Sequence, residues 1–203
     1  MKKISLLVLL LCGVLFAQAS TGLYQKLSSR YGSLTSFQAD LSQTNHFAQL
    51  GRTISYEGKI YFQPGRMLMS FDTPSPQRLL IHAGKAELYD GSSRTLYRSD
   101  ILPEFNRMNP IELLQLYWEK SSVERLKDQD GFARVRLIPK NDPHLQELSA
   151  SIHPQSGIVH RLSYMDLSDN TVSYNFTNIQ IDTMIPSAVF RFVYPEDTQI
   201  IEQ

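Results

Sequence analysis

Cysteine is almost absent from this sequence. Cys12 is the only one, and it lies in an apolar stretch at the N-terminus. The residue before it, Leu11, is bulky, whereas a cysteine that becomes lipidated normally follows a small residue. If the stretch is removed as a secretory signal, the remaining chain has no disulfide bond, no thiolate nucleophile and no metal site built on cysteine sulfur.

The N-terminal stretch has the composition of a secretory signal peptide. Lys2 and Lys3 give it a positive start, and an apolar run follows that ends in the small-residue cleavage motif Ala-Gln-Ala at Ala19. The run is too short to be a membrane-spanning helix. We therefore predict a signal peptide over residues 1–19, a single domain over residues 20–203, and a location in the periplasm.

An excess of charge of either sign is also missing. The chain has 20 basic and 20 acidic residues, and removal of Lys2 and Lys3 with the signal leaves 18 basic residues against 20 acidic ones. No basic cluster accompanies this near-neutral balance. Because binding to nucleic acid or to anionic membranes depends on such clusters, we predict no nucleic-acid partner.

Motifs for catalysis and metal binding are missing as well. None of the five histidines has a metal-ligand spacing such as H-E-x-x-H, no serine stands in G-x-S-x-G, and no glycine-rich phosphate loop occurs. Asp128 and Asp130 precede Gly131, which is typical of a hairpin turn. We therefore predict a protein that is not an enzyme and has no cofactor or metal. A secreted β-barrel enzyme with catalytic groups distant in sequence stays open as an alternative.

Short alternating stretches, in contrast, are abundant. About ten of them follow one another, from "SFQADLSQT" to "FRFVYP", with turn signals such as Asp90-Gly91 between them. Alternation of apolar and polar residues is typical of half-buried β-strands. A run of strands joined by short turns disfavours parallel βαβ units and favours one large antiparallel sheet, curled or nearly closed.

Two amphipathic helices interrupt the strands. The first, "TGLYQKLSSRYGSL", has apolar residues at spacings of four and three. The second, "NPIELLQLYWEK", begins with Asn109 as N-cap and Pro110 at the first helical position, and it carries the stripe Ile111, Leu114 and Trp118. A helix that acts as a lid and a helix packed permanently on a core share this pattern, so both interpretations stay open.

Methionines mark one predicted strand, "RMLMSF". Alternation puts Met67, Met69 and Phe71 on one face of it. Methionine is flexible and polarizable, and it suits an adaptable lining better than a tightly packed strand. These side chains therefore either fill a core between sheet and helix or line an adaptable apolar surface.

Four stretches in this order resemble the periplasmic outer-membrane lipoprotein carrier family, LolA. They are "SFQADLSQT" (36–44), "GKIYFQPGRMLMSF" (58–71), "MDLSDNTVSYNF" (165–176) and "FRFVYPEDTQII" (190–201). The likeness spans almost the whole chain after the signal. It implies a mostly β fold with inserted helices, namely an incomplete, unclosed antiparallel β-barrel with a helical lid over a hydrophobic cavity.

The resemblance also implies a function. A family member is a periplasmic chaperone or carrier that takes acylated lipoproteins from an inner-membrane ABC lipoprotein-releasing transporter, hides their acyl chains, and delivers them to the outer membrane. The implied partners are these lipoproteins, the transporter and, where one exists, an outer-membrane receptor lipoprotein. No cofactor is implied, and the carrier is expected to be monomeric. A sensor or carrier of another lipid or lipid-linked product on the same fold is the alternative.

The resemblance also directs attention to the cavity wall. The nine side chains that we predict to bind acyl chains are Phe37, Leu41, Ile60, Phe62, Met67, Met69, Phe71, Leu114 and Trp118. Many family members have an arginine just before the strand-linking proline, associated with closure of the lid. Gln63 stands there in this chain, and it lacks the charge and the five-donor fork of arginine. Arg66 follows three residues later, so Gln63 and Arg66 are the predicted lid-control residues, with the role of each left open.

Overall fold

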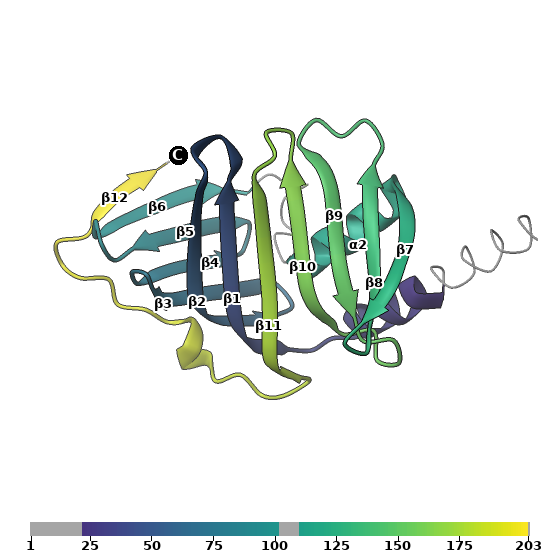
Figure 1. The fold of residues 1–203 in the computed structure, drawn as a ribbon. Helices are drawn as coiled ribbons and strands as arrows, with labels where there is room; N and C mark the ends of the chain where they lie inside the picture. Colours follow the sequence, from purple (N-terminus) through teal and green to yellow (C-terminus); the bar gives the residue numbers. More distant parts are fainter. Residues whose placement is uncertain (1–21, 102–109, 203) are drawn as a thin grey trace, which may run out of the picture.

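A computed structural model describes residues 22–101 and 110–202 of the chain, which form one twelve-stranded sheet with the two longer helices on one side (Figure 1). The strands are β1 (Phe37–Phe47), β2 (Arg52–Gln63), β3 (Arg66–Thr73), β4 (Gln77–His82), β5 (Lys85–Asp90), β6 (Thr95–Asp100), β7 (Ser121–Gln129), β8 (Phe132–Pro139), β9 (Leu145–Ile152), β10 (Val159–Asp166), β11 (Thr171–Ile181) and β12 (Gln199–Glu202). The helices are an N-terminal helix over residues 22–32, α2 (Pro110–Lys120), and the short 3-10 helices η1 (Ala48–Leu50) and η3 (Ser187–Phe190).

The sheet follows the order β12-β6-β5-β4-β3-β2-β1-β11-β10-β9-β8-β7. All neighbouring strands are antiparallel except β12 and β6, which are parallel. Because β7 and β12 are the two edges, the sheet curls but does not close. In Figure 1, β1, β2 and β11 stand upright while β3 to β6 cross behind them at a steep angle. The predicted mostly β, unclosed antiparallel architecture with inserted helices is therefore confirmed.

The two longer helices cover the inner face of the half formed by β7 to β11. Helix α2 contacts β7, β8, β9 and β10. The N-terminal helix is anchored at the turn between β9 and β10, where Lys26 Nζ donates to the Pro154 carbonyl at 2.8 Å. The Tyr31 hydroxyl also accepts the Val159 N–H at 3.1 Å. Apolar stripes at helical spacing explain why each helix buries one side against the sheet.

The C-terminal segment over residues 182–198, which we call the strap, covers the outer face of the other half, β2 to β5. Phe190 is buried with Leu68 of β3 in a small apolar cluster on that face. Further along the strap, the ring of Tyr194 lies 5.4 Å from that of Tyr89 on β5. Arg78 of β4 donates to a strap carbonyl at 2.8 Å. The strap then ends in β12, which joins the sheet beside β6.

Three segments differ from the sequence prediction. The prediction of a strand over "FRFVYP" is wrong, because this part of the strap pairs with no strand among the described residues. Its alternation is real, but Phe190 and Tyr194 lie on top of the sheet instead of within it. Strands β7 and β12 were not predicted. The first is a charged edge strand with little apolar alternation, and the second has only four residues.

Local geometry explains one predicted turn and the glycine at residue 58. Asp130 and Gly131 have φ angles of 53° and 80°, so this pair makes the predicted hairpin turn between β7 and β8. Gly58 faces the neighbouring strand β3 at a register shift, where a Cβ atom would lie 2.0 Å from the Ser70 carbonyl oxygen. Only glycine fits this close approach.

Two predicted features lie outside the described residues, namely the signal peptide over residues 1–19 and the helix cap at Asn109. Over residues 22–101 and 110–202, no helix is long and apolar enough to cross a lipid bilayer.

Candidate functional site

The structure gathers all nine predicted cavity-wall side chains in one apolar cluster. Eight of them are buried there, and Phe62 is partly buried against it. Strand pairing explains this, because Phe37 of β1 lies opposite Phe62 of β2, and Ile60 of β2 lies opposite Met69 of β3. Side chains alternate along a strand, so these positions all face the interior. Leu114 and Trp118 reach the same interior from α2.

Along the inner face of the β2 to β5 half of the sheet, side chains become less buried from β3, which carries the methionines, to β5. Met67 and Met69 are buried, and their partners on β4 are Ile81 and Leu79. The next residue along that row, Leu88 on β5, is 40% exposed. The inner face of this half therefore passes from a packed wall at β3 to an accessible surface at β5.

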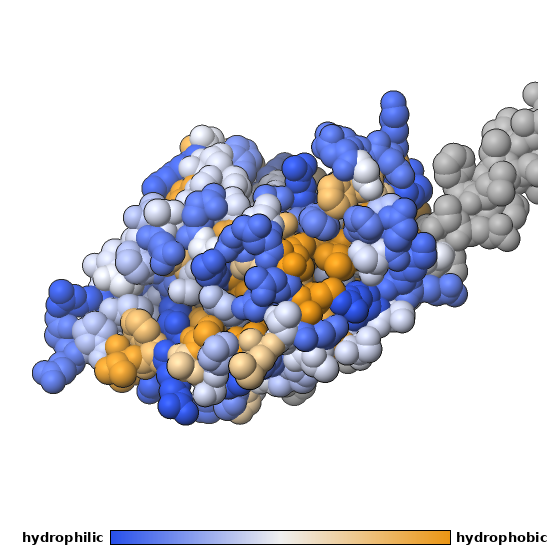
Figure 2. Space-filling model, turned by 90° about the horizontal axis from the view of Figure 1, so that it is seen from below, coloured by the Kyte–Doolittle hydropathy of each residue, from blue (hydrophilic) through white to orange (hydrophobic). Residues whose placement is uncertain are grey.

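The interior opens at the lower end of the molecule, in a cavity that we call the mouth. Figure 2 views this end and shows apolar side chains gathered in the middle of it, surrounded by hydrophilic ones. The mouth has a volume of about 460 Å³, within the usual range for ligand pockets. Its lining comprises Tyr31, Gly32, Leu34, Phe62, Pro64, Gly65, Arg66, Met67, Ile81, Ala83, Gly84 and Glu112.

The predicted lid-control residues lie at the rim of the mouth. The Arg66 guanidinium donates to Gln63 Oε1 through Nε at 3.0 Å and through Nη2 at 2.6 Å. The same guanidinium lies 4.0 Å from the ring centroid of Phe190 on the strap. Arg66 lines the mouth together with Glu112 of α2. The pair thus lies where the β2–β3 turn, the strap and the opening meet.

Two tyrosines of the interior keep their protons at neutral pH. Burial is the main cause that raises the pKa of Tyr31 to about 12. Burial, together with a hydrogen bond to Asp142, raises the pKa of Tyr117 on α2 to about 12 as well. Both phenols are therefore protonated at neutral pH, and they suit an uncharged ligand.

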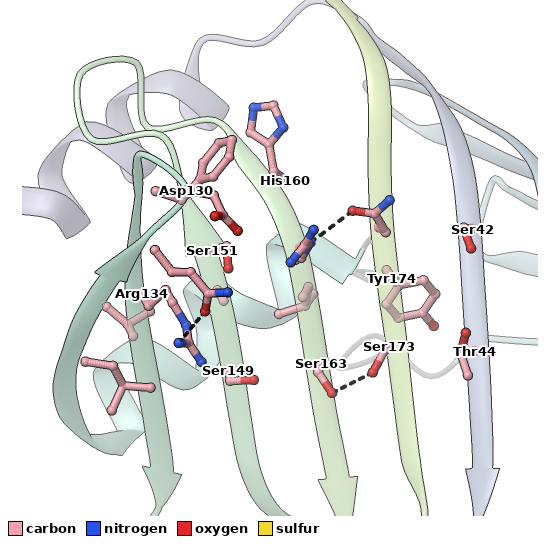
Figure 3. A pocket seen from close by; sticks show the side chains of 18 residues that line it. Ser42, Thr44, Asp130, Arg134, Ser149, Ser151, His160, Ser163, Ser173 and Tyr174 are labelled. Carbon is pink, nitrogen blue, oxygen red and sulfur yellow. Dashed lines mark hydrogen bonds between the residues drawn. The ribbon is translucent and has the colours of Figure 1, made fainter. Parts of the chain in front are cut away.

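A second, polar groove lies on the outer face of the β7 to β11 half (Figure 3). Its volume is about 270 Å³. Ser163 and Ser173 hydrogen-bond across it at 2.9 Å, and Arg161 donates to Asn175 at 3.3 Å. We did not predict this groove. Its signal in the sequence is the recurrence of small hydroxyl residues at every second position of β9, as in Ser149 and Ser151.

The described part of the chain contains no arrangement typical of an activated nucleophile. One hydroxyl–imidazole contact exists, between Thr53 Oγ1 and His46 Nδ1 at 3.0 Å, and it is exposed and lacks a hydrogen-bonded carboxylate. The His160 ring lies 4.5 Å from Phe132, and burial lowers its pKa. Within these same residues, no group of three or more histidine, cysteine, aspartate or glutamate side chains could hold a metal ion.

A family model for the outer membrane lipoprotein carrier protein LolA matches residues 32–193. The chain belongs to this family. Similar curated proteins are an outer-membrane lipoprotein carrier protein of Francisella tularensis subsp. novicida and one of Pseudoalteromonas translucida. The first is 23% identical over 93% of this chain and 90% of its own length. The second is 25% identical over 100% of this chain and 98% of its own length.

Solved structures show the same fold. An uncharacterized conserved protein of Thermus thermophilus matches with a TM-score of 0.59 at 10% identity, over 91% of this chain and 99% of that one. The lipoprotein LppX of Mycobacterium tuberculosis matches with a TM-score of 0.50 at 9% identity, over 81% of this chain and 95% of that one. At such identities the likeness shows the fold alone, and the LolA family assignment comes from the sequence.

Proposed function

We propose that this protein is a periplasmic carrier of acylated lipoproteins. It would bind their acyl chains on the inner face of the sheet and deliver them to the outer membrane. The observation that carries this proposal is the convergence of nine apolar side chains, seven from β1 to β3 and two from α2, next to an open mouth. The chain's family, and the name that the Francisella and Pseudoalteromonas relatives share, support the same function.

The energetics suit reversible binding. Burial of an acyl chain of about sixteen carbons contributes on the order of 12 kcal/mol before the cost of ordering the chain and opening the site. A carrier must also release this chain. Met67 and Met69 offer a wall that adapts to varied chains without a tight jigsaw fit. No charged group on the ligand is needed for this contact.

We propose that the two helices form the lid. Their contacts with the sheet are mainly apolar, supplemented by a few hydrogen bonds such as that between Tyr31 and Val159. An acyl chain that displaces a helix would replace apolar contacts by apolar contacts, so the two states would differ little in free energy. Arg66 and Gln63 would control the lid at the rim of the mouth. There the Arg66 guanidinium would hydrogen-bond either to Gln63 or to groups on the lid.

The wider pathway belongs to the same proposal. Residues 1–19 would direct export and be removed, and residues 20–203 would act as one monomeric domain without catalytic activity. The donor would be an inner-membrane ABC lipoprotein-releasing transporter. An outer-membrane receptor lipoprotein would accept the cargo where such a receptor exists.

A charge placed inside the interior tests the proposal. Met69→Glu should abolish binding of a purified triacylated lipoprotein, because the carboxylate would meet the acyl chain in an apolar site. Ser70→Glu is the matched control, since the next residue faces the other side of the sheet beside Lys59 and Arg78. Binding that survives Met69→Glu in a protein with an unchanged thermal unfolding curve would overturn the proposal.

A second measurement covers the case in which Met69→Glu does not fold. A photoreactive benzoylphenylalanine at Phe62, which is half-buried in the mouth, should cross-link to acylated lipoprotein and not to its unacylated form. The same group at Tyr61, on the outer face, should not. Native mass spectrometry of protein isolated from its own periplasm would then identify the cargo, and a bound free lipid would instead favour a carrier of another lipid.

A further inference from the structure

The interior changes polarity along β1. Phe37, Ala39 and Leu41 face inward and are buried among apolar side chains. The next two inward positions hold Gln43 and Asn45, and both are only half-buried. The distance along the strand from Phe37 to Gln43 is about 20 Å. The interior is thus apolar toward the lower end and polar toward the upper end.

Neighbouring strands continue the polar region. Gln43 lies opposite Tyr174 of β11, and Asn45 lies opposite Val172, whose partner on β10 is Tyr164. We call Gln43, Asn45, Tyr164 and Tyr174 the polar belt. Both tyrosines are partly buried against the same apolar cluster that contains the predicted acyl-chain wall.

The polar belt is rich in neutral hydrogen-bond donors. Gln43 Nε2 donates to Asn45 Oδ1 at 2.8 Å, which leaves one N–H of Gln43 and both N–H groups of Asn45 directed elsewhere. The rings of Tyr164 and Tyr174 lie 6.3 Å apart, and each ring carries a hydroxyl that can donate a hydrogen bond. Burial raises the pKa of both phenols, so both keep their protons at neutral pH.

The lack of positive charge at the described inward positions near the polar belt indicates which ligand groups can bind there. The inward positions from Ile54 to Phe62 on β2 and from Val172 to Phe176 on β11 hold no lysine or arginine. A buried carboxylate or phosphate would lack a counter-charge beside the polar belt, which is costly. A neutral ester carbonyl, in contrast, is an acceptor without charge and matches donors of this kind.

We infer that the polar belt binds the ester carbonyls of an acylglycerol group while the acyl chains extend along the apolar part of the interior. This inference rests on the proposed carrier function, and it specifies the part of the ligand next to the chains. The polar belt would fix where the ester groups lie along the interior, and the chains would extend from there toward the mouth. Each ester hydrogen bond is worth about a threefold change in affinity.

A pair of lipids that differ only in the carbonyls tests the inference. Dipalmitoylglycerol and its dihexadecyl ether analogue would each displace a dansylated fatty acid from the full-length mature protein. We expect the ester to bind about tenfold more tightly, as two carbonyl hydrogen bonds would provide. Tyr164→Phe removes one hydroxyl with little change of shape, and Gln43→Leu removes an amide. Each should bring the ester-to-ether ratio toward one and leave the affinity for the ether unchanged.

Controls separate this inference from the proposed function. Tyr61→Phe removes a hydroxyl from the outer face and should leave the ratio as in the wild type. Equal affinity of the wild-type protein for ester and ether would overturn the inference and leave the carrier function standing. Binding of neither lipid, together with no binding of an acylated lipoprotein, would overturn both. A ratio that stays near tenfold in both belt variants would also overturn the inference.

Discussion

The two halves of the sheet are covered from opposite sides. In the half formed by β7 to β11, helices cover the inner face and the outer face is bare and polar. In the half formed by β2 to β5, the strap covers the outer face and the inner face carries the methionines. Strand β8 accordingly buries only every second residue, whereas Met67, Leu68 and Met69 of β3 are all buried.

This difference separates stability from binding. A sheet needs at least one well-covered apolar face, and the strap supplies that face for the β2 to β5 half. The inner face of this half does not depend on the helices alone for its stability. It can therefore take up a ligand at a lower cost than the β7 to β11 half, where helix packing is the main apolar cover.

The largest effect is expected from a core residue under the helices. Leu148 of β9 is fully buried, and Leu148→Ala should lower the free energy of unfolding by about 4 kcal/mol. Met69→Ala, in the other half, should cost about 2 kcal/mol, because a flexible wall relaxes around a cavity more readily. Urea unfolding measures both.

The two variants should also differ in binding. Met69→Ala should alter the affinity for a dansylated fatty acid by several-fold, whereas Leu148→Ala should leave it nearly unchanged in the fraction that is folded. An equal stability loss in both variants, or a binding change confined to Leu148→Ala, would break the comparison between the halves.

A smaller loss is expected from the strap. Phe190 packs on Leu68 and under the Arg66 guanidinium, so Phe190→Ala should lower the free energy of unfolding by about 3 kcal/mol. Val193 is 92% exposed in the same strap, and Val193→Ala should change the stability by less than about 0.5 kcal/mol. If Phe190→Ala is as mild as Val193→Ala, the strap is not the cover of this half.

The smallest effect is expected in the pH dependence of stability, at the point where the strap meets the N-terminal helix. Asp182, where the strap begins, accepts hydrogen bonds from the Thr35 N–H and hydroxyl at 3.0 Å each. It also forms an ion pair with Arg30 of the N-terminal helix at 3.3 Å. The hydrogen bonds to Thr35, followed by the charge of Arg30, lower the pKa of this carboxyl below its usual 3.8.

A lowered pKa in the folded state gives stability that is present above the unfolded pKa and is lost as the pH falls through the folded one. Asp182→Asn should therefore lower the Tm slightly at neutral pH, and the gap to the wild type should shrink below about pH 4. Thermal unfolding followed by circular dichroism across this range measures the gap. A gap that grows on acidification would reverse the sign and contradict the assignment.

Much of the candidate site was predictable from the sequence because each wall residue sits in a strongly periodic segment. Alternation in "SFQADLSQT" and "RMLMSF" identified the inward side chains of β1 and β3, and helical spacing identified Leu114 and Trp118. The same rule missed the strap, since Phe190 and Tyr194 alternate against a sheet surface without joining the sheet. It also missed β7, whose charged edge has no apolar pattern.

The sequence by itself determined most of the strands, the turns between them and which strand and helix faces are apolar, since these follow from local alternation, glycine geometry and helical spacing. Only the tertiary structure decided which faces meet. It put Gln43 and Tyr174 side by side from positions far apart in the chain, placed Arg66 between Gln63 and the strap, and covered β3 from both sides. The physical reason is that strand pairing and strap packing join segments whose separation along the chain carries no local signal.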